Sequence, residues 1–162
     1  MLIAVVGSGE CSAEVAAAAE AVGRELALRG AIVVCGGYAG VMEAACRGAR
    51  QAGGHTIGIL GGRDPSEANP YVEFSIATGI GHARNTIVAL SGAAVIAIDG
   101  AFGTLSEIAF ALIYGTPVFG LGTWKFSHNG RGDTEIIRAS DPLDAVEKAL
   151  AAAKSREPHR SM

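Results

Sequence analysis

Long apolar runs, paired cysteines and clustered basic residues are all scarce in this sequence of 162 residues. No apolar segment approaches the roughly 20 residues that a bilayer-spanning helix needs, and the apolar start Leu2–Val6 carries no basic leader. We therefore expect a cytoplasmic protein without a membrane contact. Cys11, Cys35 and Cys46 are odd in number and lack C-x-x-C spacing or a nearby histidine pair, so neither a disulfide framework nor a metal site is expected.

Basic residues are few and scattered. There are 13 lysines and arginines against 16 acidic residues, which gives a formal net charge of −3. Proteins that bind nucleic acid non-specifically gather positive charge on one face, so nucleic acid is not an expected partner. Lys125, Lys148 and Lys154 lie outside the glycine-rich turns that could hold pyridoxal phosphate, so amino-acid decarboxylation is not expected either.

The remaining composition is typical of a compact α/β protein, with 49% hydrophobic residues, 18% charged residues and 23 glycines. Short β-branched runs alternate with alanine-rich helical stretches, which is the pattern of βαβ units. We expect one domain over residues 1–153, built as an α/β doubly wound, mostly parallel sheet with helices on both faces (Rossmann-like), and a flexible tail over residues 154–162. The expected strands are Leu2–Val6, Ala31–Cys35, Thr56–Leu60, Glu73–Ile76, Ala93–Ile98 and Pro117–Leu121; the expected helices are Ser12–Leu28, Gly40–Gln51, Gly81–Leu90, Thr104–Tyr114 and Pro142–Ala153. Gly61–Tyr71 and Thr123–Asp133 are less regular and are expected to be loops or lids.

Glycines follow several of the expected strands, at the carboxyl-terminal rim where such sheets bind ligands. The first turn contains Gly7 and Ser8 and is close to a dinucleotide fingerprint, but a serine replaces the third glycine. It predicts either contact with a phosphate or ribose, or a tight strand-to-helix turn. The second strand ends in Cys35-Gly36-Gly37 instead of a ribose-binding acid, so a dinucleotide cofactor is not expected.

The second turn, Gly36-Gly37-Tyr38-Ala39-Gly40-Val41-Met42, places three glycines before a helix. Successive N–H groups in such a turn can form a concave anion nest, although a purely structural turn explains the glycines as well. Gly36, Gly37, Gly40 and Met42 are therefore candidate ligand-binding residues.

A third glycine-rich turn leads into Arg84 and Asn85 at the start of an expected helix. An arginine at this position can hold a phosphate or carboxylate with two parallel hydrogen bonds, and the alternative is a solvated side chain. We take Arg84 and Asn85 as candidate ligand-binding residues. His82 in the same turn is more typical of a surface or helix-start position than of a proton-transfer group.

The fourth turn, Asp99-Gly-Ala-Phe-Gly-Thr-Leu-Ser-Glu107, joins an apolar strand to an apolar helix. Gly100, Gly103 and Thr104 offer backbone donors at the positive end of that helix, where an anion is favoured, and Glu107 lies one turn further on. Thr104-Leu-Ser-Glu107 also matches the capping box, in which both side chains satisfy backbone donors of their own helix. The sequence leaves open whether Glu107 caps the helix, faces a ligand, or does both.

The turn Gly36-Gly37-x-x-Gly40-Val41-Met42, the Arg84 helix and the turn Gly103-Thr104-x-x-Glu107, in this order, resemble the Lonely Guy (LOG) superfamily, once described as lysine decarboxylases. The resemblance extends roughly from Leu2 to Gly122. Phosphoribohydrolases of that superfamily carry P-G-G-x-G-T-x-x-E and an arginine–lysine pair, and they cleave the N-glycosidic bond of nucleoside 5′-monophosphates.

Three positions depart from the hydrolase pattern. Asp99 stands where those enzymes have proline, Ala101 where they have their second glycine, and Asn85 where lysine follows the arginine. Around Arg84 and Glu107 the sequence looks closer to the molybdenum cofactor carrier branch and its bacterial relatives, whose carriers bind a phosphorylated pterin.

The resemblance therefore implies a binding protein for a phosphorylated nucleotide-like or pterin ligand, which requires no further cofactor and can have the molybdenum cofactor as its ligand. The alternative is a nucleoside 5′-monophosphate phosphoribohydrolase, in which Glu107 stabilises oxocarbenium charge or positions water and Arg84 orients the phosphate. A third alternative is a structural or regulatory oligomer with a vestigial pocket. The superfamily also implies a homodimer or larger homo-oligomer.

Overall fold

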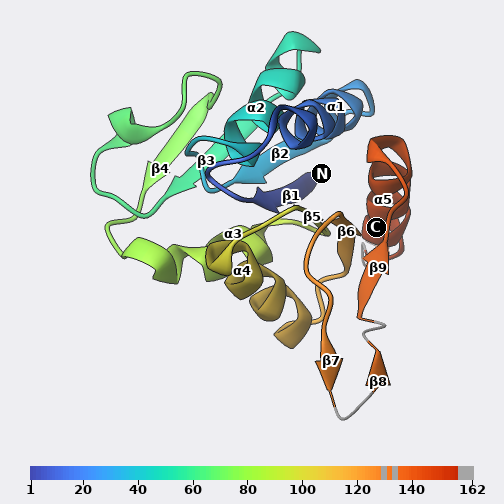
Figure 1. The fold of residues 1–162 in the computed structure, drawn as a ribbon. Helices are drawn as coiled ribbons and strands as arrows, with labels where there is room; N and C mark the ends of the chain where they lie inside the picture. The colour runs from blue at the N-terminus through green and yellow to red at the C-terminus, as the bar shows by residue number, and fades with distance from the viewer. Residues whose placement is uncertain (129–130, 133–134, 157–162) are drawn as a thin grey trace, which may run out of the picture.

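The computed structural model describes residues 1–128, 131–132 and 135–156. Within them, a seven-stranded sheet has the order β4-β3-β2-β1-β5-β6-β9, and every neighbouring pair is parallel (Figure 1). The strands are β1 (Leu2–Gly7), β2 (Ile32–Cys35), β3 (Thr56–Leu60), β4 (Phe74–Ala77), β5 (Val95–Ile98), β6 (Val118–Leu121) and β9 (Ile136–Arg138). The order reverses at β1, which has β2 on one side and β5 on the other. The doubly wound parallel sheet expected from the sequence is confirmed.

Helices cover both faces of the sheet (Figure 1). One face packs against α1 (Ala13–Leu28), α2 (Val41–Gln51) and α5 (Pro142–Arg156), and the other against α3 (Asn85–Ser91) and α4 (Phe102–Ile113). Strand side chains alternate between the two cores: Ile3 and Val5 belong to the first, Ala4 and Val6 to the second. This alternation explains why strands buried on both faces read as continuous apolar runs.

Small residues bring α1 and α2 close together. A Cβ atom on Gly23 would overlap the backbone carbonyl of Ala45, and one on Gly48 would overlap that of Glu20. The alanine-rich character of the two helices thus serves a close contact inside the chain. Arg47 of α2 also pairs with Glu20 of α1 at 2.8 Å, at the edge of this contact.

Several boundaries differ from the sequence expectations for local reasons. The helix expected over Gly81–Leu90 begins as a 3-10 turn, η2 (Gly81–Arg84), and continues as α3, because Gly79 and Gly81 adopt left-handed φ angles of 68° and 58°. Strand β9 was not predicted, since it has three residues and two of them are exposed. Helix α5 extends beyond the expected end at Ala153 to Arg156, and the rest of the expected tail, 157–162, lies outside the described residues.

The two segments expected to be irregular contain short elements. Gly61–Tyr71 includes the 3-10 turn η1 (Pro65–Glu67). Thr123–Asp133 includes the antiparallel pair β7 (Ser127–His128) and β8 (Arg131–Gly132), while 129–130 and 133–134 are outside the described residues. In the part of the chain that the structure describes, no helix combines the length and the hydropathy needed to cross a membrane.

Candidate functional site

A cavity of about 570 Å³ lies at the carboxyl-terminal rim of the sheet, where the strand order reverses. Ligands of open parallel sheets bind at this switch point, because the loops that follow neighbouring strands diverge there. The walls come from the segments after β1, β2, β3, β4 and β5. The lining residues are Gly7, Ser8, Gly9, Tyr38, Met42, Gly61, Gly62, Gly81, His82, Arg84, Asn85, Ala101, Gly103, Thr104 and Glu107.

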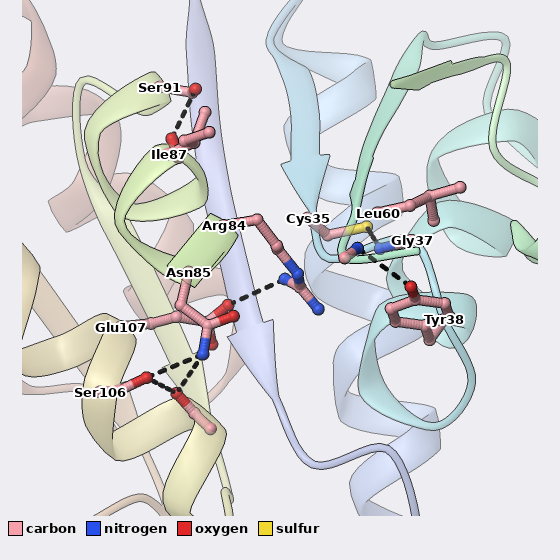
Figure 2. A network of polar contacts seen from close by, with 12 residues as sticks. Cys35, Gly37, Tyr38, Leu60, Arg84, Asn85, Ile87, Ser91, Ser106 and Glu107 are labelled. Atoms are coloured by element: carbon pink, nitrogen blue, oxygen red, sulfur yellow. Dashed lines mark hydrogen bonds and ion pairs between the residues drawn. The ribbon is translucent and has the colours of Figure 1, made fainter. Parts of the chain in front are cut away.

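Arg84 and Glu107 face one another within this cavity. Arg84 Nη1 lies 3.4 Å from Glu107 Oε1, and the two residues are only 7% and 6% exposed. Figure 2 shows Arg84 reaching from η2 between Glu107 on α4 and Tyr38 after β2. Burial raises the pKa of Glu107 to about 7, although the positive charge of Arg84 acts in the opposite direction. Glu107 therefore titrates near neutral pH, where a solvated glutamate is already ionised.

The start of α4 decides how Thr104 and Glu107 are used. The helix begins at Phe102 with Ala101 in the N-cap position, and no side chain caps it. Thr104 is thus the third residue of the helix, three positions beyond the N-cap Ala101, and the capping-box alternative, which needs Thr104 as the N-cap, is wrong. Thr104 Oγ1 is buried and has no hydrogen-bond partner among the described residues. Both side chains are left for the cavity.

Gly36 makes room for the guanidinium of Arg84. A Cβ atom on residue 36 would lie 2.7 Å from Arg84 Cζ and closer still to both terminal nitrogens. The guanidinium also lies over the ring of Tyr38, with Cζ 5.5 Å from the ring centroid. The guanidinium of Arg84 thus packs directly against the backbone of Gly36, which does not itself line the cavity.

The other glycines expected at the site also lie behind its lining. Gly37 has a φ of 78° and packs near Leu60, and Gly40 has a φ of 66° and packs against the backbone of Ser8 and Gly9. Gly100, with a φ of 129°, lies against the side chain of Thr104. These glycines shape the turns, whereas Gly7, Ser8, Met42, Arg84, Asn85, Gly103, Thr104 and Glu107 reach the cavity itself.

Tyr38 is a site residue that the sequence reasoning missed. Its hydroxyl accepts hydrogen bonds from the backbone N–H groups of Gly61 and Gly62 at 3.0 and 3.1 Å, and it donates to Glu67 at 3.4 Å. The tyrosine thereby ties the irregular Gly61–Tyr71 segment to the cavity as one of its walls. An aromatic residue between the glycines of the second turn was the only available signal.

Asn85 joins the two helices on the Glu107 side of the cavity. Its Nδ2 donates to Ser106 Oγ at 2.8 Å and contacts the carbonyl oxygen of Gly103 at 3.4 Å (Figure 2). Ser106 Oγ in turn donates to the same carbonyl at 2.7 Å. Asn85, at the position where the hydrolases carry lysine, thus fixes the start of α4.

Asp99 fixes the same turn from the other side. Its carboxylate accepts a hydrogen bond from Ser8 Oγ at 2.7 Å, and its carbonyl accepts one from the Thr123 hydroxyl. Asp99 has a φ of 52°, the left-handed region, which among non-glycine residues Asn and Asp tolerate best. The aspartate that replaces the proline of the hydrolases therefore connects the turns after β1 and β5.

The fold and the position of the cavity define a Rossmann-like protein whose switch-point cavity contains a buried arginine beside a buried glutamate. The chain belongs to the SLOG cluster4 family, whose model matches residues 1–147. This membership confirms the superfamily that the three ordered turns indicated.

Two solved structures show the same architecture at substantial identity. The molybdenum cofactor binding protein from Rippkaea orientalis is 34% identical, with a TM-score of 0.83 over 93% of this chain and 95% of that one. The molybdenum cofactor carrier protein from Chlamydomonas reinhardtii is 31% identical, with a TM-score of 0.82 over 95% of this chain and 98% of that one. An uncharacterised protein from Archaeoglobus fulgidus is 43% identical over 121 residues, which are 75% of this chain and 80% of its own length. The structural neighbours thus include the carrier branch that the sequence around Arg84 and Glu107 resembles.

Proposed function

We propose that this protein binds a phosphorylated, nucleotide-like or pterin-like small molecule in the cavity at the switch point, as a carrier of the molybdenum cofactor type. The observation that carries the proposal is the unpartnered hydroxyl of Thr104, which is 2% exposed and lines the cavity in the first turn of α4. A buried hydroxyl without a partner costs free energy, and a ligand oxygen supplies the missing hydrogen bond.

The phosphate is assigned to the start of α4. Gly103 leaves the backbone uncovered at this point. The space beside it is open, because Asn85 Nδ2, at 3.9 Å, is the one atom in the described part of the chain within 4 Å of the position that a Cβ atom would take. The unpaired N–H groups of a helix N-terminus and its dipole favour an anion. Arg84 lines the same cavity next to Glu107 of α4 and adds a positive charge, so the helix start and the arginine together suit one phosphoryl group.

The rest of the cavity suits a flat heterocycle. Tyr38 and Met42 contribute apolar surface, while Gly61 and Gly62 leave space beside them. A volume of about 570 Å³ falls within the range of ~300–1,000 Å³ for small-molecule sites. The molybdenum cofactor joins a phosphate to a pterin ring, so as cargo it matches both parts of this cavity, and the names of the two carrier relatives support the same choice.

A ligand panel tests the proposal directly. Purified protein is mixed with AMP, with GMP and with molybdenum cofactor released from a molybdoenzyme, and bound ligand is detected by native mass spectrometry. We expect retention of the phosphorylated pterin and loss of retention in Arg84→Met. Arg24→Met, which changes an exposed arginine on α1, is the matched control and should bind normally. Equal binding by both variants would remove Arg84 from the site.

A second candidate function is hydrolysis of nucleoside 5′-monophosphates. The observation in its favour is the buried Glu107 beside Arg84, since a carboxylate next to the ligand can stabilise oxocarbenium charge or position water. Chromatography of released free base from the same nucleotide mixtures tests it. Base release that disappears in Glu107→Gln, with nucleotide still bound, would establish the hydrolase and replace the carrier proposal.

An apolar surface supports the homo-oligomer that the superfamily implies. Phe74 and Ile76 on β4 are 56% and 51% exposed, and their register with Ile57 and Ile59 places them on the α3 face of the sheet. Ile87 on α3 is exposed as well. Neighbouring exposed apolar side chains on an edge strand are a candidate contact surface, and we assign this one to a second copy of the chain in the cytoplasm.

Light scattering after size-exclusion chromatography tests the assembly. We expect the wild-type protein to elute as a dimer or larger species, and Ile76→Glu to elute with a smaller mass. Leu28→Glu is the matched control, because Leu28 is 64% exposed on α1, on the other face of the sheet. A monomeric wild type would overturn the assignment.

The panel of ligands should include a short single-stranded oligonucleotide, for which no binding is expected.

A further inference from the structure

Two thiols lie directly behind the cavity and have no part in the proposed binding. Cys35 is the last residue of β2, Cys46 lies within α2, and their Sγ atoms are 3.5 Å apart. Both side chains are fully buried, and they cluster with Met42, which lines the cavity. Met42 therefore belongs both to the cavity lining and to the buried cluster that contains the two thiols.

The surroundings of the two sulfur atoms differ. The backbone N–H of Gly37 donates to Cys35 Sγ at 3.3 Å (Figure 2), and the thiol of Cys46 is the second group in contact with that sulfur. The hydrogen bond with Cys46, then the Gly37 N–H and the charge of Arg84, lower the pKa of Cys35 against its burial. The same hydrogen bond, together with burial, raises the pKa of Cys46. Because its sulfur also accepts the Gly37 N–H, Cys35 is assigned as the nucleophile of the pair.

We propose that Cys35 and Cys46 are a redox pair that hydrogen peroxide converts into a disulfide, and that this bond rearranges the Gly36–Gly37 turn behind the ligand cavity. The Cys35 sulfur attacks one peroxide oxygen, the O–O bond breaks, and a sulfenic acid and one water molecule are formed. The Cys46 sulfur then attacks Cys35 Sγ and the S–O bond breaks, with the Cys46 proton leaving in a second water molecule. Two thiols are oxidised by two electrons, and one peroxide is reduced to two molecules of water.

The bond changes the turn because the sulfur atoms must move. A disulfide has an S–S length of about 2.05 Å, so the two Sγ atoms approach by roughly 1.5 Å from their contact distance. Cys35 Sγ then leaves the Gly37 N–H that points at it. The next residue, Gly36, lies against the guanidinium of Arg84, so the movement reaches the arginine of the cavity. The regulatory consequence, weaker ligand binding by the oxidised protein, rests on the proposed function.

Peptide mapping tests the disulfide itself. Cys35 and Cys46 fall in one tryptic peptide, residues 30–47, whereas Cys11 falls in residues 1–24. After peroxide treatment, unfolding and alkylation, we expect peptide 30–47 to be lighter by two hydrogen atoms and to carry no alkyl group. After reduction it should carry two. Two alkyl groups without reduction, or a bond to Cys11, would overturn the proposal.

Hydrogen–deuterium exchange tests the movement of the turn. We expect amides 36–40 of the oxidised protein to exchange several-fold faster than those of the reduced protein, and to recover after reduction. Cys11→Ala should behave as the wild type, and Cys46→Ala should show no change with peroxide. Unchanged exchange in an oxidised wild-type sample would refute the coupling. Because neither measurement uses a ligand, both remain decisive if the carrier function fails.

Discussion

The guanidinium of Arg84 lies against the α-carbon of Gly36, and no side chain fits between them. An arginine from the segment after β4 is thereby held by the turn after β2 and directed towards Glu107 on α4. The orientation of Arg84 therefore depends on residue 36 having no side chain, although this residue does not line the cavity.

Gly36→Ala should therefore displace Arg84. Forcing a methyl group into this contact costs about 1–3 kcal/mol, and we expect the free energy of unfolding in urea to fall by that amount. Gly9→Ala is the control, since a Cβ atom on Gly9 would have nothing within 4 Å. The same loss of stability in both variants would contradict the close contact.

Thr104→Val should raise stability and lower ligand affinity together. Removing a buried hydroxyl that has no partner relieves a penalty of about 1–3 kcal/mol in the free protein. The variant also lacks the hydrogen bond that we propose Thr104 donates to the ligand phosphate, which corresponds to a roughly tenfold or greater loss of affinity. Urea denaturation and titration calorimetry measure the two effects, with Thr104→Ser as the control that keeps the hydroxyl. A destabilised Thr104→Val would show that the hydroxyl already has a partner.

Glu107 should make stability depend on pH in a defined direction. Its pKa rises from 4.5 to about 7 on folding, so the folded state binds the proton more tightly than the unfolded state. The contribution is fully present below pH 4.5 and is lost as the pH rises to about 7, with a total of up to about 3 kcal/mol. The free energy of unfolding of the wild type, relative to Glu107→Gln, should fall across this interval. A flat difference would mean that Glu107 titrates normally.

Arg84 should hold the pKa of Glu107 below the value that burial alone gives. In Arg84→Met we expect the Glu107 carboxyl to titrate at a higher pH than in the wild type, because the opposing positive charge is gone. NMR titration of protein labelled at the glutamate carboxyl carbons measures both values. An unchanged titration in the variant would mean that the two groups do not interact, and a shift to lower pH would contradict their attraction.

Asp99 should tolerate only a few substitutions. Asp99→Asn keeps a residue type that accepts a φ of 52°, whereas Asp99→Ala lacks this tolerance and also loses the hydrogen bond from Ser8. We expect Asp99→Ala to lower the free energy of unfolding by about 1–3 kcal/mol and Asp99→Asn to change it less. Thermal or urea denaturation of the pair measures the difference. Equal losses would rule out the backbone explanation.

Most of the sheet followed from hydrophobic patterning, because its central strands are buried on both faces and each is bounded by glycine. Strand β9 did not follow, since only Ile136 of its three residues is buried and the pairing with β6 is a long-range contact. The division of the expected helix Gly81–Leu90 into a 3-10 turn up to Arg84 and the helix α3 from Asn85 was not predictable for another reason. The φ angles of Gly79 and Gly81 are set by the turn around them.

At the site, the residue types were predictable and their orientation was not. Thr104 and Glu107 have the same spacing in a capping box and in a ligand site, and only the start of α4 at Phe102 distinguishes the two. Gly36 resembles an anion donor in the sequence, but the space it leaves is filled by Arg84, which is 48 positions further along the chain. Distant contacts of this kind have no signature in a local pattern.

The reversal of strand order at β1 has a consequence for how the site comes into being. Tyr38, Met42 and Arg84 belong to the part of the chain that builds β1 to β4, and Thr104 and Glu107 to the part that adds β5 and β6. Neither part alone encloses the cavity, so a chain cut near Gly92 should recover a complete binding site only when both fragments reassociate. A ligand bound between the two parts would stabilise their association. It would therefore slow the separation of β1 from β5 more than the local unfolding of β4.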